Sequence, residues 1–224
     1  MSPRKQLVVN ADDFGFTPDV NEGIVEAHRD GILTATTLMA NGAAFEDAVR
    51  LARQTPTLDV GCHLVLVSGS SPLTGKPYPL TVARLAEEFG IRWVRRPFDL
   101  PLTTLKGTVP MVKRMTSGSL GFLRSRFHRV LERHGCRTTG HFAGFQMTGR
   151  LRTAELVELL GMLPAGSTEL MVHPGRCREP LRQARTRLKE SREWELEALL
   201  APETRQALQR HAIELVNYSG FTLE

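Results

Sequence analysis

The feature that most constrains the fold is an apolar run near the N-terminus that ends in two adjacent carboxylates. Residues 7–11, Leu-Val-Val-Asn-Ala, are followed directly by Asp12, Asp13, Phe14 and Gly15. A run of this kind is typical of a buried strand, and the residues after it are typical of a turn. Neighbouring carboxylates at the end of a buried strand repel each other and lose hydration, so their charge must be compensated, most simply by a cation. The alternative is that the pair only begins a loop, where Asp is common.

Strand and helix patterns alternate in the first part of the chain. Pro18 is a helix-start signal, and Gly31 is a matching stop signal. The pattern then predicts a strand at 34–40, a helix at 43–54 and a strand at 58–67. The last of these is apolar on both faces, so we expect it to be covered on both sides. This order predicts an α/β fold with a parallel sheet and crossover helices.

The second half of the chain continues this pattern less regularly. The sequence predicts helices at 81–89, 120–135 and 153–162, a C-terminal helical region at about 194–215, and short strands at 137–142 and 169–172. Residues 92–119 have weak periodicity, and we expect their aromatics Trp93 and Phe98 to be exposed. Such a long irregular piece inside a domain is typical of a lid or binding loop. Because no repeat or linker divides the chain, we expect one domain over residues 1–224 with a lid or insertion at 92–119.

Composition and charge exclude several classes of protein. The hydrophobic content of 41% and charged content of 24% are those of an ordinary globular protein. No apolar run approaches the ~20 residues that cross a bilayer, and the N-terminal run is too short for a signal peptide. Three cysteines without CxxC spacing argue against a disulfide framework or a thiolate zinc site. We therefore expect a cytoplasmic protein whose net charge of +5 allows anionic partners without choosing among them.

Potential metal ligands and bases fall at or near the ends of four predicted strands. Asp12 and Asp13 end the first strand, His63 lies in the third, His141 lies near the end of the fourth, and His173 follows the fifth. The carboxyl ends of parallel strands gather on one face of such folds. One carboxylate and two imidazoles suit a divalent ion with open positions for water, and a second carboxylate could act as base on that water. Any one of these histidines can instead be a hydrogen-bonded core residue.

Four segments of the chain resemble the YdjC-like carbohydrate deacetylases of the ChbG type. They read VVNADDFG, DVNEGIVEAHRDGILTATTLMAN, GCHLVL and TELMVHPG, and the resemblance extends over residues 7–218. It implies a distorted (β/α) barrel of the polysaccharide-deacetylase type. It also implies a hydrolase that removes the acetyl group from an N-acetylated sugar, with a divalent metal ion, Zn²⁺ or Mg²⁺, as cofactor.

The resemblance also assigns roles to individual residues. Position by position, Asp13, His63 and His141 match the metal ligands of the family. Asp12 matches the catalytic base, and His173 is the best match for the acid. These assignments are what the resemblance implies, and the residues themselves establish only that suitable side chains follow several strands.

One stretch departs from the family pattern. Typical members have a His-rich run after the first histidine of the fourth-strand motif, whereas here Phe145 and Met147 stand at the later positions. The form GHFAGFQMTG, together with HLVLVSGSSPL, resembles the branch associated with hopanoid biosynthesis. That resemblance implies a GlcNAc-bearing hopanoid lipid as substrate and peripheral contact with the inner membrane. Aromatic and basic residues in 92–119 suit a lipid interface, although they equally suit a lid packed over the site.

Two other functions stay open at this point. The basic pI allows a nucleic-acid-binding protein, but neither 92–114 nor 176–192 has the aromatic interleaving or helix-turn-helix pattern of one, so we expect no nucleic-acid partner. The depleted His-rich run allows a metal-binding relative without catalysis. A homodimer is compatible with each of these functions.

Overall fold

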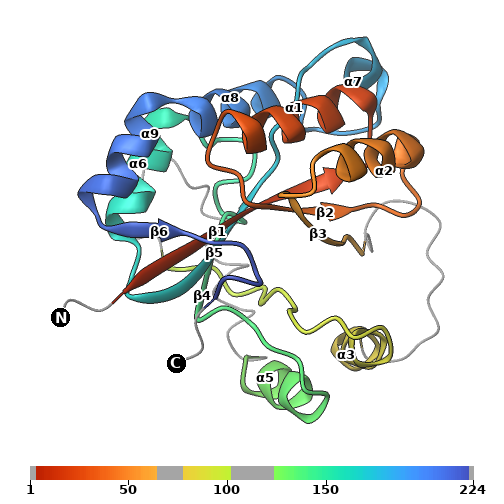
Figure 1. Cartoon of the computed structure of the whole chain (residues 1–224), viewed down its shortest axis with the longest axis vertical. Coiled ribbons are helices and arrows are strands. Elements are labelled where there is room, and N and C mark those ends of the chain that lie inside the picture. Colours follow the sequence, from red (N-terminus) through yellow and green to blue (C-terminus); the bar gives the residue numbers. More distant parts are fainter. Residues whose placement is uncertain (1–3, 65–77, 102–123, 222–224) are drawn as a thin grey trace.

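Six parallel strands form one sheet with β1 at its centre (Figure 1). This computed structural model describes residues 4–64, 78–101 and 124–221. The strands are β1 (Lys5–Phe14), β2 (Ala35–Leu38), β3 (Asp59–Cys62), β4 (His141–Ala143), β5 (Gly166–Val172) and β6 (Ile213–Leu215). Their order is β3-β2-β1-β5-β4, and β6 pairs with the start of β1. The α/β class with parallel strands predicted from the sequence is confirmed.

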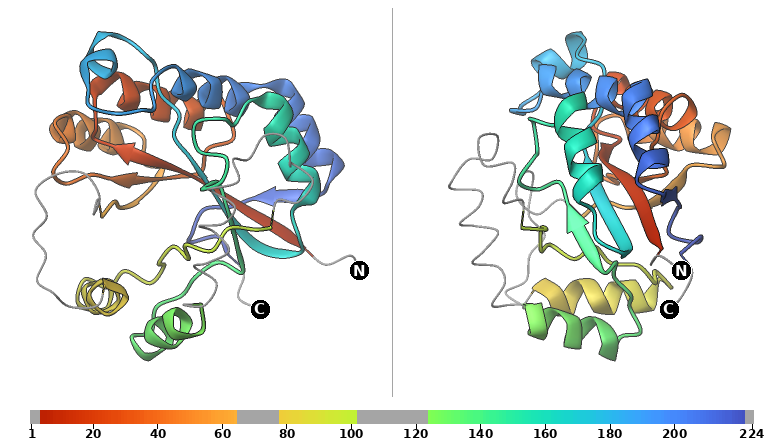
Figure 2. Two further views of the ribbon diagram at one scale, coloured as in Figure 1. Left: turned by 180° about the vertical axis from the view of Figure 1, so that it is seen from behind. Right: turned by 90° about the vertical axis from the view of Figure 1, so that its left-hand side faces the viewer.

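The helices lie in two separate groups on either side of the sheet (Figures 1 and 2). The larger group covers one face, and α3 and α5 lie together on the other side. The helices are α1 (Pro18–Arg29), α2 (Phe45–Gln54), α3 (Tyr78–Glu88), α5 (Arg124–Arg133), α6 (Thr153–Met162), α7 (Glu179–Gln183), α8 (Glu190–Leu200) and α9 (Pro202–Arg210). Helices therefore follow strands along the chain as crossover connections require.

The alternation of side chains along β1 separates two packing environments. Leu7, Val9 and Ala11 belong to the main core with the apolar faces of α1, α6, α8 and α9, whereas Val8 packs in a second cluster with Val216 and its neighbours. Successive residues of a strand point to opposite faces, which explains this division. The central strand is buried on both faces, so its end is where polar side chains can first leave the core.

Helix α1 approaches the loop after β5 unusually closely. A side-chain Cβ at Gly23 would lie 2.6 Å from the Cα of Gly175, which no real side chain tolerates. The two glycines therefore let α1 pack directly against the His-Pro-Gly turn that follows β5. This contact fixes the position of that turn relative to the start of the chain.

Two sequence predictions about strands and helices are wrong. The strand at 58–67 was expected to be covered on both sides. Val60 is instead 37% exposed and Cys62 is exposed, because among the described residues β3 pairs with β2 alone, at the edge of the sheet. Residues 65–67 lie outside the described part. The helical region expected at about 194–215 consists of α8 and α9, but its last residues form the strand β6. The residue before a proline disfavours helical geometry, and Pro202 ends α8 in this way.

Helices α3 and α5 have a small core of their own. Buried Ala83, Ala86, Leu131 and Cys136 form it, with Val94 packed against them. We call residues 78–101 and 124–137 the helical lobe. Residues 102–119 of the predicted lid lie outside the described residues.

The two aromatics that were expected to be exposed are packing residues. Phe98 is 3% exposed and its ring meets that of Phe127 edge-on at 5.4 Å. Trp93 packs against Tyr218 and Phe221, with ring centroids 5.9 and 5.0 Å away. The expectation of exposure is therefore wrong, because both rings find apolar partners that are distant in sequence.

Candidate functional site

The end of β1 is irregular where the two aspartates lie. The pairing with β2 slips between Ala11 and Phe14, and Asp13 has a positive φ of 71°. Such bulges and left-handed non-glycine residues are costly and are found preferentially at functional sites. The irregularity sends Asp12 and Asp13 to different partners, which come from opposite sides of the sheet.

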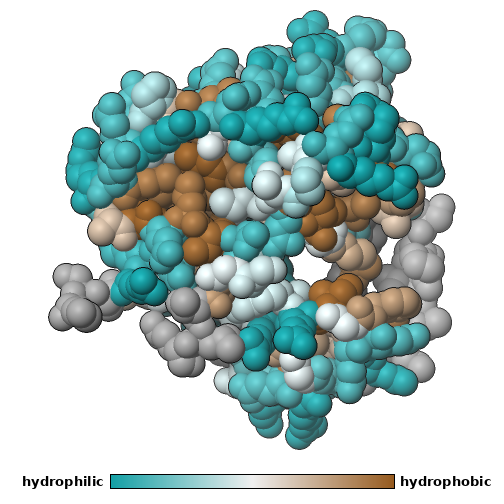
Figure 3. Space-filling view, in the orientation of Figure 1, coloured by the Kyte–Doolittle hydropathy of each residue, from teal (hydrophilic) through white to brown (hydrophobic). Residues whose placement is uncertain are grey.

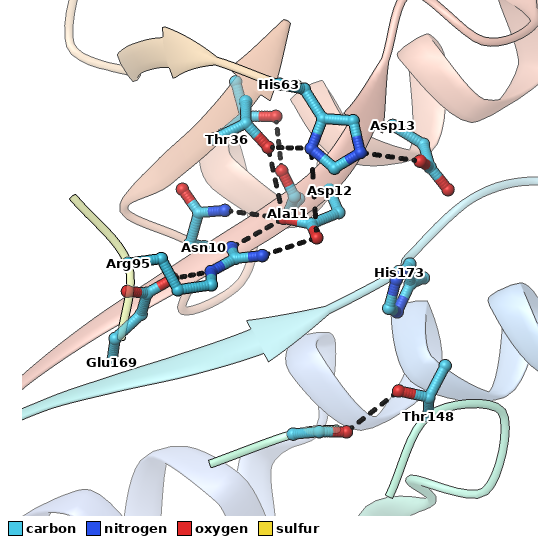
Figure 4. Close-up of polar contacts among 12 residues, drawn as sticks. Asn10, Ala11, Asp12, Asp13, Thr36, His63, Arg95, Thr148, Glu169 and His173 are labelled. Atoms are coloured by element: carbon cyan, nitrogen blue, oxygen red, sulfur yellow. Dashed lines mark hydrogen bonds and ion pairs between the residues drawn. The ribbon is translucent and has the colours of Figure 1, made fainter. Parts of the chain in front are cut away.

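Asp12 is a buried carboxylate with four hydrogen-bond donors (Figure 4). Arg95 of the helical lobe donates through Nη1 and Nη2 to its two oxygens, at 2.6 and 2.7 Å. Asn10 Nδ2 and Thr37 Oγ1 donate to Oδ1 at 3.0 and 3.1 Å. Although burial alone would raise the pKa of Asp12, the Arg95 guanidinium holds it well below its usual range. Asp12 is therefore ionised.

Arg95 joins Asp12 to a second buried carboxylate. Its Nε donates to Glu169 Oε1 at 2.5 Å, and Glu169 also bonds to the Tyr218 side chain. Burial raises the pKa of Glu169, while the Arg95 charge opposes this effect. The neighbouring carboxylates raise the pKa of Arg95 well above its ordinary value. One guanidinium from the lobe thus contacts two carboxylates of the sheet.

The hydrogen bonds around His63 define its tautomer. Thr37 Oγ1 lies 3.1 Å from Asp12 Oδ1 and 3.0 Å from His63 Nδ1. An ionised carboxylate only accepts, so the single hydroxyl proton of Thr37 points to Asp12. Thr37 must then accept a proton from His63 Nδ1, which leaves a lone pair on His63 Nε2. This ring nitrogen is available as a ligand.

Asp13 and His63 face each other across a gap that suits a cation. Asp13 Oδ1 lies 3.4 Å from His63 Nε2, and in the tautomer just assigned both atoms present lone pairs. Two such atoms attract each other only through a proton or a metal ion between them. Ligands at about 2.1 Å from a tetrahedral ion are themselves about 3.4 Å apart. The donor types and their separation therefore fit a divalent ion held by Asp13 and His63.

Asp13 has a second partner on the helical side of the sheet. Arg192 of α8 donates through Nη2 to Asp13 Oδ2 at 2.5 Å. The side chain of Arg192 is 1% exposed. Each of the two aspartates is thus paired with one arginine, Asp12 with the lobe and Asp13 with α8.

His173 lies directly after β5, next to the same group (Figure 4). Its backbone N–H donates to Glu195 Oε2 at 2.5 Å, and its ring Nδ1 lies 4.0 Å from the same oxygen. Among the described residues, the buried Nδ1 has no hydrogen-bond partner. The charge of His173 also contributes to the low pKa of Asp12. The structure therefore brings Asp12, Asp13, His63 and His173 to one end of the sheet.

The structure does not bring His141 to this end. His141 is the first residue of β4 and pairs with Thr168, which in turn pairs with Leu7. Asp12 is five residues further along β1 than Leu7, about 16 Å at ~3.3 Å per residue. The prediction that His141 shares a metal site with Asp13 and His63 is corrected here, because β4 begins at this histidine instead of ending near it.

The carboxyl end of β4 carries apolar side chains instead. Phe145, two residues beyond the strand, is 38% exposed, and Met147 is 1% exposed in the core. Asp99 of the lobe holds this turn through a 2.6 Å hydrogen bond from the Gln146 backbone N–H. Within the described ranges, no group of three or more His, Cys, Asp or Glu side chains is placed to hold a metal.

Sequence reasoning missed the residues that support the site. Glu169, Arg192 and Glu195 are buried charges and Arg95 is half-buried, and nothing in their local pattern distinguishes them from the many exposed charges of the chain. The one usable signal is that Arg192 and Glu195 are three residues apart, which places both on the same side of a helix.

The fold and this site define a parallel α/β protein with a carboxylate–imidazole pair suited to a divalent ion. The chain belongs to the YdjC-like protein family, whose model matches residues 6–82 and 78–210. A carbohydrate deacetylase of Vibrio cholerae is 31% identical over 96% of each chain, and carbohydrate deacetylase 2 of Listeria innocua is 30% identical over 95% of this chain and 97% of its own. A carbohydrate deacetylase of Brevibacillus brevis is 62% identical over 65 residues, which are 29% of this chain and 26% of that protein.

A solved structure is similar in fold. The putative cellobiose-phosphate cleavage protein of Enterococcus faecalis V583 matches 98% of this chain and 100% of its own with a TM-score of 0.67 and 23% identity. At this identity the likeness establishes the architecture alone. The resemblance to the hopanoid-associated branch stays a prediction.

Proposed function

We propose that this protein is a carbohydrate N-deacetylase that hydrolyses the acetamide of an N-acetylglucosamine-type sugar. The similarity to carbohydrate deacetylases over almost the whole chain supports this activity. The observation that carries the proposal is the 3.4 Å separation of Asp13 Oδ1 and His63 Nε2, beside an ionised Asp12 and a buried His173. This combination of groups suits metal-assisted hydrolysis of an amide.

Asp13 and His63 would hold the divalent ion, and the near-tetrahedral separation of their atoms favours Zn²⁺ over Mg²⁺. When bound, such an ion polarises a carbonyl and lowers the pKa of water toward ~7. His141 is not included in this set, because the register of β4 places it at the other end of the sheet.

The remaining residues would handle protons. Asp12 is the proposed acceptor of the proton of the attacking water. The N–H donors of Arg95 keep it in the anionic form and fix its orientation, at some cost in basicity. His173 is the proposed donor to the leaving amine. Glu195 holds its backbone and lies near Nδ1, which leaves Nε2 as the nitrogen available to a substrate.

The test is release of acetate and free amine from a panel of N-acetylglucosamine glycosides by the Zn²⁺-loaded protein. We expect release by the wild type and by Asp30→Asn, a matched change in an aspartate that ends α1 far from the site. Asp13→Asn should lose both bound metal and release. A wild type that binds metal but releases acetate from none of the sugars would contradict the proposal and favour a metal-binding relative without catalysis.

We further propose that the substrate is lipid-linked and that the helical lobe makes peripheral contact with an anionic membrane. In the described part of the chain, no helix is long and apolar enough to span a bilayer. The lobe exposes Leu85 (39%), Phe89 (70%) and Ile91 (42%). It carries nine arginines against four acidic residues, a formal charge of +5. In Figure 3 hydrophilic surface surrounds α5 and apolar surface gathers toward α3. Apolar side chains among cations suit an anionic bilayer.

Flotation with vesicles tests this contact. The protein should float with vesicles that contain phosphatidylglycerol, and much less with pure phosphatidylcholine. The paired change Phe89→Ser and Ile91→Ser should abolish flotation and slow turnover on a lipid-linked N-acetylglucosamine, while turnover on a short soluble glycoside is kept. Leu215→Ser, at an exposed residue of β6 outside the lobe, is the matched control. Equal losses of turnover on both substrates would contradict the membrane contact and indicate that the lobe acts only as a lid over the site.

A further inference from the structure

Arg192 is the largest side chain that is fully buried in the described structure. Its aliphatic part passes Gly175, where a Cβ would lie 3.3 Å from Arg192 Cδ. Its guanidinium lies over the ring of Phe16, 5.7 Å from the centroid, and its Nε donates to the Leu188 carbonyl at 3.3 Å. This route brings a full positive charge from α8 through the core to the end of β1.

Asp13 is the carboxylate with which this buried charge pairs. Nη2 binds Asp13 Oδ2, whereas Nη1 has no hydrogen-bond partner among the described residues. Burial of an arginine costs several kcal/mol and is compensated only partly by a single carboxylate. If position 192 of α8 had only to pack in the core, an apolar side chain would fill it equally well without this cost. The cost is explained if Arg192 acts on Asp13 itself.

The effect on Asp13 follows from the atoms involved. A carboxylate has two oxygens, and Arg192 occupies Oδ2. Oδ1 is thereby turned to His63 Nε2. Without Arg192, the side chain at this half-buried, left-handed position could rotate, or could offer both oxygens to a cation.

We propose that Arg192 is a positioning residue that restricts Asp13 to one ligating oxygen and aims that oxygen at the metal position. This inference rests on the proposed metal site of Asp13 and His63. Residues behind metal ligands orient them, and their loss typically lowers metal affinity about 10–100-fold.

The test compares Arg192→Met and Arg192→Lys with the wild type, using Co²⁺ as a spectroscopic probe. We expect the wild type to give the strong visible absorption of a four-coordinate Co²⁺ site. Arg192→Met should weaken Co²⁺ binding about 10–100-fold and change the visible spectrum, because Asp13 is no longer restricted. Arg192→Lys keeps the charge and one donor, so it should recover part of the affinity and of the spectrum.

Arg96→Met is the matched control. Arg96 is 9% exposed and donates to the Thr139 and Gly140 carbonyls just before β4, away from the site. Its loss removes a buried guanidinium, so it should lower stability without changing the Co²⁺ spectrum. In activity assays Arg192→Met should lower kcat more than it changes KM.

The outcomes separate this inference from the proposed function. A wild type that binds no Co²⁺ or Zn²⁺ overturns the metal site. A wild type that binds Co²⁺, with unchanged affinity and spectrum in folded Arg192→Met, overturns the role of Arg192. If Arg192→Met does not fold, Arg192→Lys is measured instead. A wild-type Co²⁺ spectrum and affinity in Arg192→Lys would contradict the inference, because lysine cannot reproduce the geometry of the guanidinium.

Discussion

The carboxyl ends of β1 and β4 lie at the same edge of the sheet but place different kinds of side chain there. β1 ends in two ionisable side chains, each held by an arginine from a different side. β4 starts with its histidine and ends in an apolar turn with Phe145. The difference shows that a strand contributes to a site only through the residues at its carboxyl end. A histidine five positions too early is structurally remote, however suitable its chemistry.

Parallel alanine variants of two histidines test this comparison most directly. His63→Ala should fold, because His63 follows an exposed edge strand, but should lose bound Zn²⁺ and all measurable deacetylation. His141→Ala should keep both. Elemental analysis and acetate release measure the outcome. Loss of metal from His141→Ala but not from His63→Ala would reverse the comparison.

The second prediction separates the two aspartates at the end of β1. Asp12→Asn should keep bound metal, since Asp13 and His63 are unchanged, while acetate release falls about 10²–10⁴-fold, the usual contribution of a general base. Metal content and kcat are measured on the same sample. Near-normal turnover would remove Asp12 from the proton-transfer role and leave it as a charge that holds Arg95.

The third prediction concerns the turn at the end of β4. Burial raises the pKa of Asp99 to about 6, although backbone N–H groups of that turn act in the opposite direction. The fold therefore favours the protonated form. The stabilisation from this group is complete below pH ~4 and is lost as the pH rises through 6, about 2–3 kcal/mol of unfolding free energy in total. Urea unfolding at several pH values measures it.

The matched variant for this effect is Asp99→Asn. The amide keeps an acceptor for the Gln146 N–H but does not titrate. The difference in unfolding free energy between wild type and variant should change between pH 4 and pH 7. The wild type should become less stable relative to the variant as the pH rises. Two parallel curves would show that Asp99 has an ordinary pKa.

The smallest effect is expected from placing an imidazole at the carboxyl end of β4. Phe145→His puts a ligand at an exposed position that the family pattern gives to histidine. We expect Zn²⁺ affinity to rise about tenfold, equivalent to ~1.4 kcal/mol. Isothermal titration against the wild type measures the change. No gain in affinity would mean that this turn does not face the metal position.

The local sequence patterns predicted the helices and strands, but not which strands pair with one another or in what register. The run ending in Asp12 and Asp13, the helix begun by Pro18 and the alternation of strands and helices all follow from short-range chemistry, and the structure shows them. The edge position of β3 and the start of β4 at His141 depend on which strands pair and in what register. Strands of three or four residues are too short for their apolar pattern to specify that register from the sequence.

The supporting charges of the site were beyond sequence reasoning for a related reason. Arg95 and Arg192 reach the aspartates from 83 and 179 residues away. In the sequence they stand among many arginines, most of which lie on the surface. Only the packing of the lobe and of α8 shows that these two arginines reach the aspartates.

The contact between Arg95 and Asp12 has a thermodynamic consequence for the lobe. Arg95 belongs to the lobe, and Asp12 belongs to the sheet, so the position of one and the charge balance of the other cannot change independently. By linkage, a membrane bound by the lobe that alters this contact changes the affinity for substrate by some factor. Substrate must then change the affinity for the membrane by that same factor. If the lobe makes the proposed membrane contact, this ion pair would make surface attachment and substrate binding reciprocal effectors.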